Sequence, residues 1–147
     1  DVGALIVVVR ESISDSVLES GTMINAVISS ELLETIFFPK SPLHDGAVIV
    51  KGNKIIAAGC YLPLSQEQTL AKELGTRHRA ALGITELNPT VTAIVVSEET
   101  GIITAVYDRQ IKRYLDGQNL TKALQYAYNM ELPSSRDTFW GVDGHAE

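Results

Sequence analysis

The stretch "LGTRHRAALGI" (74–84) places Arg77, His78 and Arg79 side by side in an acidic chain. Thr76 is a good N-cap, and the alanines and leucine that follow favour a helix that begins there. The first turn of a helix normally attracts Asp or Glu, because the backbone dipole is positive at this end. Two guanidiniums beside free backbone N–H groups instead predict a site for phosphate. The alternative is an exposed basic turn that pairs with a nearby glutamate, namely Glu67, Glu73 or Glu86.

A second group, His44-Asp45-Gly46-Ala47, lies in a loop directly before an apolar run. Its imidazole and carboxylate provide half of a site for Mg²⁺ or Mn²⁺. Gly46 and Ala47 are small enough to let a ligand approach the backbone closely. The alternative is a simple turn, because Asp-Gly is a common turn dipeptide.

Two further groups stand at the ends of apolar runs. We interpret Ser97 as a ligand for a phosphate oxygen and Glu98 or Glu99 as a further metal ligand, since ligands bind at strand ends in open sheets. Tyr61 and Leu62 would hold a flat base by stacking. The alternative for Glu98 and Glu99 is that both are solvated at a loop tip. The alternative for Tyr61 and Leu62 is ordinary core or edge packing. Together the four groups predict a metal-dependent nucleotide site, although the P-loop and dinucleotide-binding motifs are absent from the sequence.

Composition limits the classes of protein and partner. A chain of 147 residues predicts one domain. Its net charge of −6 argues against a general nucleic-acid or membrane surface, so the anion site must be local. The single Cys60 excludes an internal disulfide and a cysteine-based zinc site, and we expect it to be a small buried hydrophobe. The sequence has no membrane-length apolar run and begins at Asp1, so we expect a fragment whose membrane anchor, if any, lies outside it.

The elements that must position these residues are strands and helices in mixed order. Apolar runs predict strands at 3–11, 90–97 and 102–108, and a hairpin at 47–62 that turns at Gly52-Asn53. Helices are predicted at 29–38, at 77 to about 86, at 109–115 and at 119–130, the last ended by Pro133. Residues 12–28 have turn points at Gly21 and Asn25, and the tail 134–147 lacks periodicity. The predicted fold class is α/β (mixed α+β), a single domain over 1–147 with a central mixed sheet flanked by helices.

Four motifs occur in order, namely "PLHDGAVIV", "AAGCYLPLS", "ELGTRHRAALGI" and "VVSEETG". This set resembles the diadenylate cyclase domain, the family that makes cyclic di-AMP from two ATP molecules. The likeness runs from about Gly3 to about Tyr107. "PLHDGA" is most similar to the membrane-tethered branch of the family. Residues 108–147 match no family pattern and are interpreted as C-terminal helices and a tail.

The resemblance implies a role for each candidate residue. Asp45 would bind the catalytic Mn²⁺ or Mg²⁺ and help to activate the ribose 3′-hydroxyl. The further metal ligands would be His44 and Glu99, with Glu98 as the alternative to Glu99. The triphosphate would be held by Thr76, Arg77, His78, Arg79 and Ser97. Gly46 and Ala47 would lie against the ribose, and Tyr61 and Leu62 would border the adenine.

The resemblance also implies an assembly. One chain carries one copy of each motif, so two chains must face each other for each 3′-hydroxyl to reach the other ATP's α-phosphate. We therefore expect a catalytic homodimer, no nucleic-acid partner, and a cytoplasmic domain tethered to a membrane only through a segment outside this chain. The alternatives are an ATP or cyclic di-AMP sensor without turnover, a different nucleotidyltransferase or phosphohydrolase, and a structural domain without a site.

Overall fold

Seven strands form one mixed sheet in the computed structural model, which describes residues 2–67, 74–128 and 139–140. In chain order they are β1 (Ala4–Val8), β2 (Thr22–Val27), β3 (Ala47–Lys51), β4 (Lys54–Cys60), β5 (Thr92–Val96), β6 (Ile103–Tyr107) and β7 (Gln110–Lys112). Their order across the sheet is β2-β4-β3-β1-β5-β6-β7. β1 and β3 are parallel, and the other neighbouring pairs are antiparallel. The predicted mixed fold is therefore confirmed.

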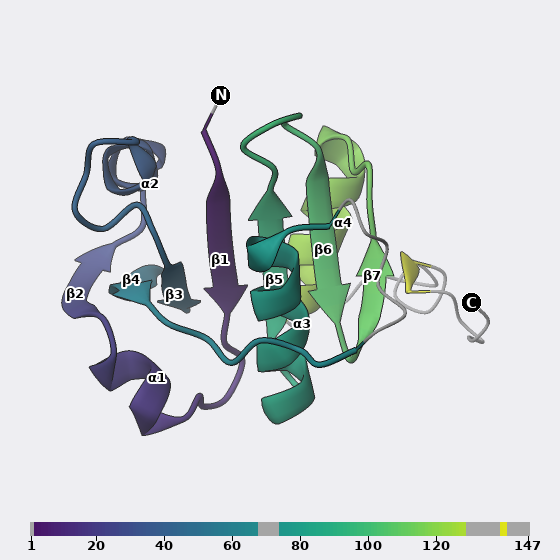
Figure 1. The fold of residues 1–147 in the computed structure, drawn as a ribbon, viewed down its shortest axis with the longest axis horizontal. Helices are drawn as coiled ribbons and strands as arrows, with labels where there is room; N and C mark the ends of the chain where they lie inside the picture. The colour runs from purple at the N-terminus through teal and green to yellow at the C-terminus, as the bar shows by residue number, and fades with distance from the viewer. Residues whose placement is uncertain (1, 68–73, 129–138, 141–147) are drawn as a thin grey trace.

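Helices cover both faces of the sheet. They are α1 (Asp15–Glu19), α2 (Ser30–Phe37), α3 (Thr76–Leu87) and α4 (Gly117–Ala127). Figure 1 shows α3 in front of the sheet and α4 behind it. Successive side chains of a strand point to opposite faces, so Leu5 and Val7 of β1 pack in the same apolar cluster as Ile84 of α3, while Ala4 packs with α2. Burial of each large apolar side chain contributes about 1.5–3 kcal/mol to the free energy of folding. The sheet and the helices on its two faces form three layers.

Elements with strong local signals form where the sequence predicts them. The helix predicted at 29–38 is α2, and the Ser29 hydroxyl accepts a hydrogen bond of 3.0 Å from the backbone N–H of Leu32. The predicted hairpin is β3 and β4, joined at Gly52 with a φ of 61°. Asn and Gly suit such two-residue turns because they accept left-handed backbone angles. These two predictions are confirmed.

The start of α3 differs from the prediction by one position. Gly75 has the extended backbone of an N-cap, and Thr76 is the first helical residue, so Thr76 does not cap the helix. Glycine is accepted at N-caps without a side-chain acceptor. Gly75 has no side chain to accept hydrogen bonds from the first backbone N–H groups of α3, an arrangement that suits an anion at this helix end.

One predicted helix is wrong, and one region contains elements for which the sequence makes no prediction. Residues 109–115 were predicted as a helix, but they contain β7, which pairs antiparallel with β6. Asp108 and Arg109 adopt positive φ angles of 50° and 68°, which turns the chain back tightly along β6. Residues 12–28 also contain α1 and β2, which the sequence analysis did not predict. Their local patterns are weak because α1 is short and β2 is a largely exposed edge strand.

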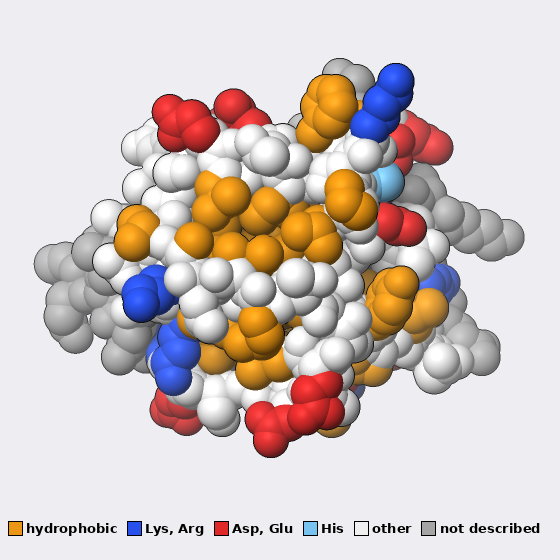
Figure 2. Space-filling model, turned by 90° about the vertical axis from the view of Figure 1, so that its left-hand side faces the viewer, with side chains coloured by type: hydrophobic (Ala, Val, Ile, Leu, Met, Phe, Trp, Pro, Cys, Tyr) orange, Lys and Arg blue, Asp and Glu red, His pale blue; other side chains and the backbone are white. Residues whose placement is uncertain are grey.

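The outer surface and the C-terminal part complete the described fold. Figure 2 shows hydrophobic side chains gathered on the side where β2 forms the sheet edge, and Met23 and Val27 of β2 are exposed.

Phe139 and Trp140 are buried in the cluster that contains α4. The predicted helix end at Pro133 and most of the predicted tail lie outside the described residues. Within the described part of the chain, no helix has the length and apolar character needed to cross a membrane.

Candidate functional site

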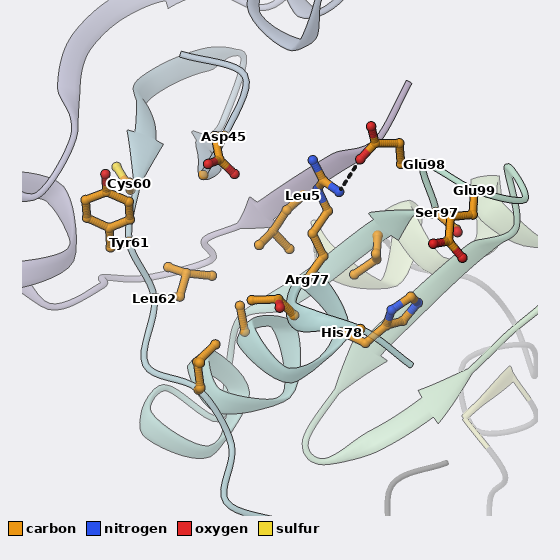
Figure 3. A pocket seen from close by; sticks show the side chains of 16 residues that line it. Leu5, Asp45, Cys60, Tyr61, Leu62, Arg77, His78, Ser97, Glu98 and Glu99 are labelled. Atoms are coloured by element: carbon orange, nitrogen blue, oxygen red, sulfur yellow. Dashed lines mark hydrogen bonds and ion pairs between the residues drawn. The ribbon is translucent and has the colours of Figure 1, made fainter. Parts of the chain in front are cut away.

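A pocket of about 590 Å³ lies at one edge of the sheet, beside the start of α3. Because β1 and β3 run opposite to β4 and β5, the starts of the first two strands meet the ends of the other two at this edge. Residues of all four motifs therefore meet there, as Figure 3 shows. The lining residues are Leu5, Asp45, Gly46, Cys60, Tyr61, Leu62, Leu64, Gly75, Thr76, Arg77, His78, Ala80, Val95, Ser97, Glu98 and Glu99.

The Asp45 side of the pocket depends on a glycine turn. Gly46 has a φ of 137°, a backbone conformation that residues with a Cβ rarely adopt. A Cβ on Gly46 would also lie 2.8 Å from the carbonyl carbon of Gly59 in β4. The close approach of these two backbones presents the exposed Asp45 at the rim of the pocket. The fold therefore requires glycine at position 46, in addition to the contact with ribose that is predicted for Gly46.

The Arg77 side chain extends from the first turn of α3 across the pocket. Its Nη1 lies 3.4 Å from Oε1 of Glu98, and the two side chains are 25% and 62% exposed. Exposed ion pairs of this kind contribute about 0.2–1 kcal/mol. A phosphate group makes stronger bidentate contacts with a guanidinium, so it can displace the glutamate.

His78 points in another direction from the same turn. It is buried, and its Nε2 lies 3.5 Å from the hydroxyl of Thr104 in β6. Burial lowers the pKa of His78 below its usual 6.5, and the positive charges of Arg113 and Arg77 lower this pKa further. The imidazole is therefore neutral near pH 7. A neutral ring can donate one hydrogen bond but adds no positive charge to a phosphate site.

Cys60 lies on the apolar side of the pocket. Its thiol is buried, and burial raises its pKa to about 11. The thiol is therefore protonated at neutral pH and is a poor nucleophile. The expectation of a small buried hydrophobe at this position is confirmed.

Three predicted site residues do not line the pocket. Arg79 donates from Nη1 to the carbonyl of Glu67 at 3.1 Å, because side chains two positions apart on a helix point roughly 200° apart. The Nδ1 of His44 lies 2.8 Å from the carbonyl oxygen of Ser41, and Ala47 is fully buried in β3. The roles predicted for these residues in phosphate, metal and ribose binding stay predictions.

The pocket also has an apolar wall made of residues for which the sequence predicts no role in the site. It includes Leu5 of β1, Leu64 after β4 and Val95 of β5. Leu5 and Val95 belong to apolar strand runs and Leu64 follows a proline, so their residue types alone do not separate them from core packing. Only the tertiary structure places them in the lining of the same pocket as Tyr61 and Leu62.

The carboxylates of the pocket suit a divalent cation that also has ligands from a bound molecule. Within the described residues, no group of three or more His, Cys, Asp or Glu side chains is placed to hold a metal. The pocket lining does provide the carboxylates of Asp45, Glu98 and Glu99, of which Glu98 contacts Arg77. Mg²⁺ is commonly held by one or two carboxylates, substrate phosphates and water. The donor set therefore suits a cation that arrives with a nucleotide.

Comparison with known sequences gives consistent matches. A family model described as "DisA bacterial checkpoint controller nucleotide-binding" matches residues 1–111. A "Diadenylate cyclase" of Listeria monocytogenes is 54% identical over 123 residues, which are 84% of this chain and 45% of that protein. The "Cyclic di-AMP synthase CdaA" of Bacillus subtilis is 45% identical over 141 residues, 95% of this chain and 51% of that protein. The chain thus spans about half the length of these curated relatives.

Solved structures are similar in both fold and sequence. A double mutant of DacA from Staphylococcus aureus matches with a TM-score of 0.82 and 42% identity, over 86% of this chain and 84% of that one. A structure described as a hypothetical membrane spanning protein from Bacillus cereus matches with a TM-score of 0.73 and 44% identity. This second match covers 78% of this chain and 55% of that one.

Proposed function

Because the chain belongs to the diadenylate cyclase family, we propose that it condenses two ATP molecules into cyclic di-AMP and releases two pyrophosphates. The observation that carries this proposal is the pocket itself. It brings Asp45, Arg77 and Ser97, which come from three separate motifs, to one apolar slot. The family membership supports adenine as the base, and the pocket offers apolar and cationic groups that suit a nucleotide.

The pocket supports one orientation of ATP. The base would occupy the slot between Tyr61 and Leu62, where stacking on an aromatic ring and apolar contact are both available. The triphosphate would lie at the start of α3, where free N–H groups, the helix dipole and Arg77 all favour negative charge. The ribose would then lie near Gly46 and Asp45, on the opposite side of the pocket.

The side chains would contribute to an in-line displacement in distinct ways. Asp45 would accept a hydrogen bond from the attacking 3′-hydroxyl, which orients it and draws its proton away. Arg77 would neutralise charge that develops on the phosphate oxygens. Mn²⁺ or Mg²⁺, held by Asp45 with the phosphates, would supply further charge neutralisation when bound, with Glu99 as a candidate second ligand.

The product requires two nucleotides, whereas each chain has one copy of each motif. A two-fold symmetric ring is most simply formed in an isologous dimer, in which the two pockets face each other. We therefore propose that the catalytic unit is a homodimer.

The Bacillus cereus relative described as membrane spanning supports a membrane attachment through a segment outside this chain.

The dimer gives a testable concentration dependence. Specific activity should fall as the protein is diluted below the dissociation constant of the dimer, because a monomer binds ATP but cannot bring two nucleotides together. Initial rates over a range of protein concentrations, with sedimentation data at the same concentrations, measure this directly. A specific activity that stays constant where the protein is monomeric would contradict the proposed dimer.

The proposed function is tested by product identity. The protein is incubated with ATP and either Mn²⁺ or Mg²⁺, and the products are separated by chromatography beside a sample with excess chelator. Cyclic di-AMP and pyrophosphate, formed only with metal, are expected. ATP binding without a cyclic product would instead favour a sensor, and a different product would indicate another nucleotidyltransferase or a phosphohydrolase.

A further inference from the structure

Gly3 lies outside the four motifs but directly beneath the Arg77 guanidinium. A Cβ built on Gly3 would lie 2.6 Å from Nη1, 2.7 Å from Cζ and 3.0 Å from Nη2 of Arg77. These are its three nearest neighbours, so all of the closest contacts come from one functional group. Gly3 is itself buried, just before β1. The guanidinium thus lies against bare backbone.

Other crowded glycines of the chain are different. A Cβ on Gly21 would lie 2.5 Å from the carbonyl oxygen of Ala58, and one on Gly83 would overlap the carbonyl oxygen of Pro63. Backbone atoms cannot move away cheaply, so these two glycines are needed for the fold. The atoms nearest to Gly3 instead belong to the end of a flexible side chain. A methyl group there would displace the guanidinium and leave the packing of the strands in place.

The position of Arg77 is thus limited on two sides. The Gly3 backbone lies against its planar group, and Glu98 contacts Nη1 from across the pocket. A guanidinium needs a defined plane to make two parallel hydrogen bonds to a phosphate. We propose that Gly3 is a positioning residue, which holds the Arg77 guanidinium in the orientation that receives the nucleotide phosphates. This inference rests on the proposed function of the pocket.

The first test is Gly3→Ala, assayed for ATP binding and for cyclic di-AMP formation with Mg²⁺. We expect the dissociation constant for ATP to rise about tenfold, the size of one lost charged hydrogen bond. The thermal midpoint should stay close to that of the original protein. The matched control is Gly117→Ala, because a Cβ on Gly117 meets nothing within 4 Å and this residue lies in α4.

A double-mutant cycle separates positioning from a structural effect. The lysine of Arg77→Lys lacks the planar group that the new methyl would contact. In this background, Gly3→Ala should therefore raise the dissociation constant for ATP by less than about twofold. An equal loss of affinity in both backgrounds, or no loss in the original one, would overturn the proposal. If the original protein binds ATP but makes no cyclic di-AMP, the proposed function fails while the binding cycle still tests Gly3.

Discussion

Asp45→Asn should lower the rate of cyclic di-AMP formation about 10²–10⁴-fold, the range that a positioned acid–base group contributes. The amide keeps the size of the side chain but loses the charge and the basicity that the proposed mechanism assigns to Asp45, for holding a cation and for drawing a proton from the 3′-hydroxyl. ATP should still bind, because the proposed phosphate-binding groups, Arg77 and the start of α3, are separate from Asp45 in the pocket lining. Chromatographic rates and equilibrium ATP binding measure the two quantities separately.

The matched control for this variant is Asp108→Asn. Asp108 is exposed in the turn between β6 and β7 and has a φ of 50°, a conformation that asparagine accepts readily. The control should therefore retain full activity. If Asp45→Asn kept more than about a tenth of the original rate, Asp45 would not have the acid–base or metal-binding role assigned to it.

Arg77→Lys is the second variant with a large expected effect, a loss of about 10²-fold in kcat/KM. Lysine keeps the positive charge but lacks the planar fork that makes two parallel contacts with a phosphate. The loss should appear in kcat as well as in KM, because charge on the phosphate oxygens develops further in the transition state. Steady-state kinetics of pyrophosphate release with saturating metal give both parameters.

Arg109→Lys is the corresponding control, since Arg109 is exposed in the turn before β7, away from the pocket. Its kinetics should match those of the original protein. A rise in KM alone for Arg77→Lys, with kcat unchanged, or unchanged kinetics, would show that Arg77 does not stabilise the transferred phosphate.

Local patterns in the sequence were sufficient for part of the fold. The Ser29 cap predicts α2, and the Gly52-Asn53 turn predicts the β3–β4 hairpin, because each depends on residues a few positions apart. The class of fold follows from the mixture of such elements. Strand β7 was mispredicted because its outcome depends on pairing with β6, which overrides the weak propensity of its own residues.

The sequence by itself determined that Asp45, Arg77 and Ser97 belong to chemical motifs, and the pocket contains all three. Only the tertiary structure decided which neighbours accompany them. Arg77 lines the pocket while Arg79 contacts the Glu67 carbonyl, because the helical repeat turns these two side chains apart. Gly3 lies against Arg77 although the two are distant in sequence, and local patterns contain no information on such a contact. It arises because α3 packs across β1, which sets the space that each side chain occupies.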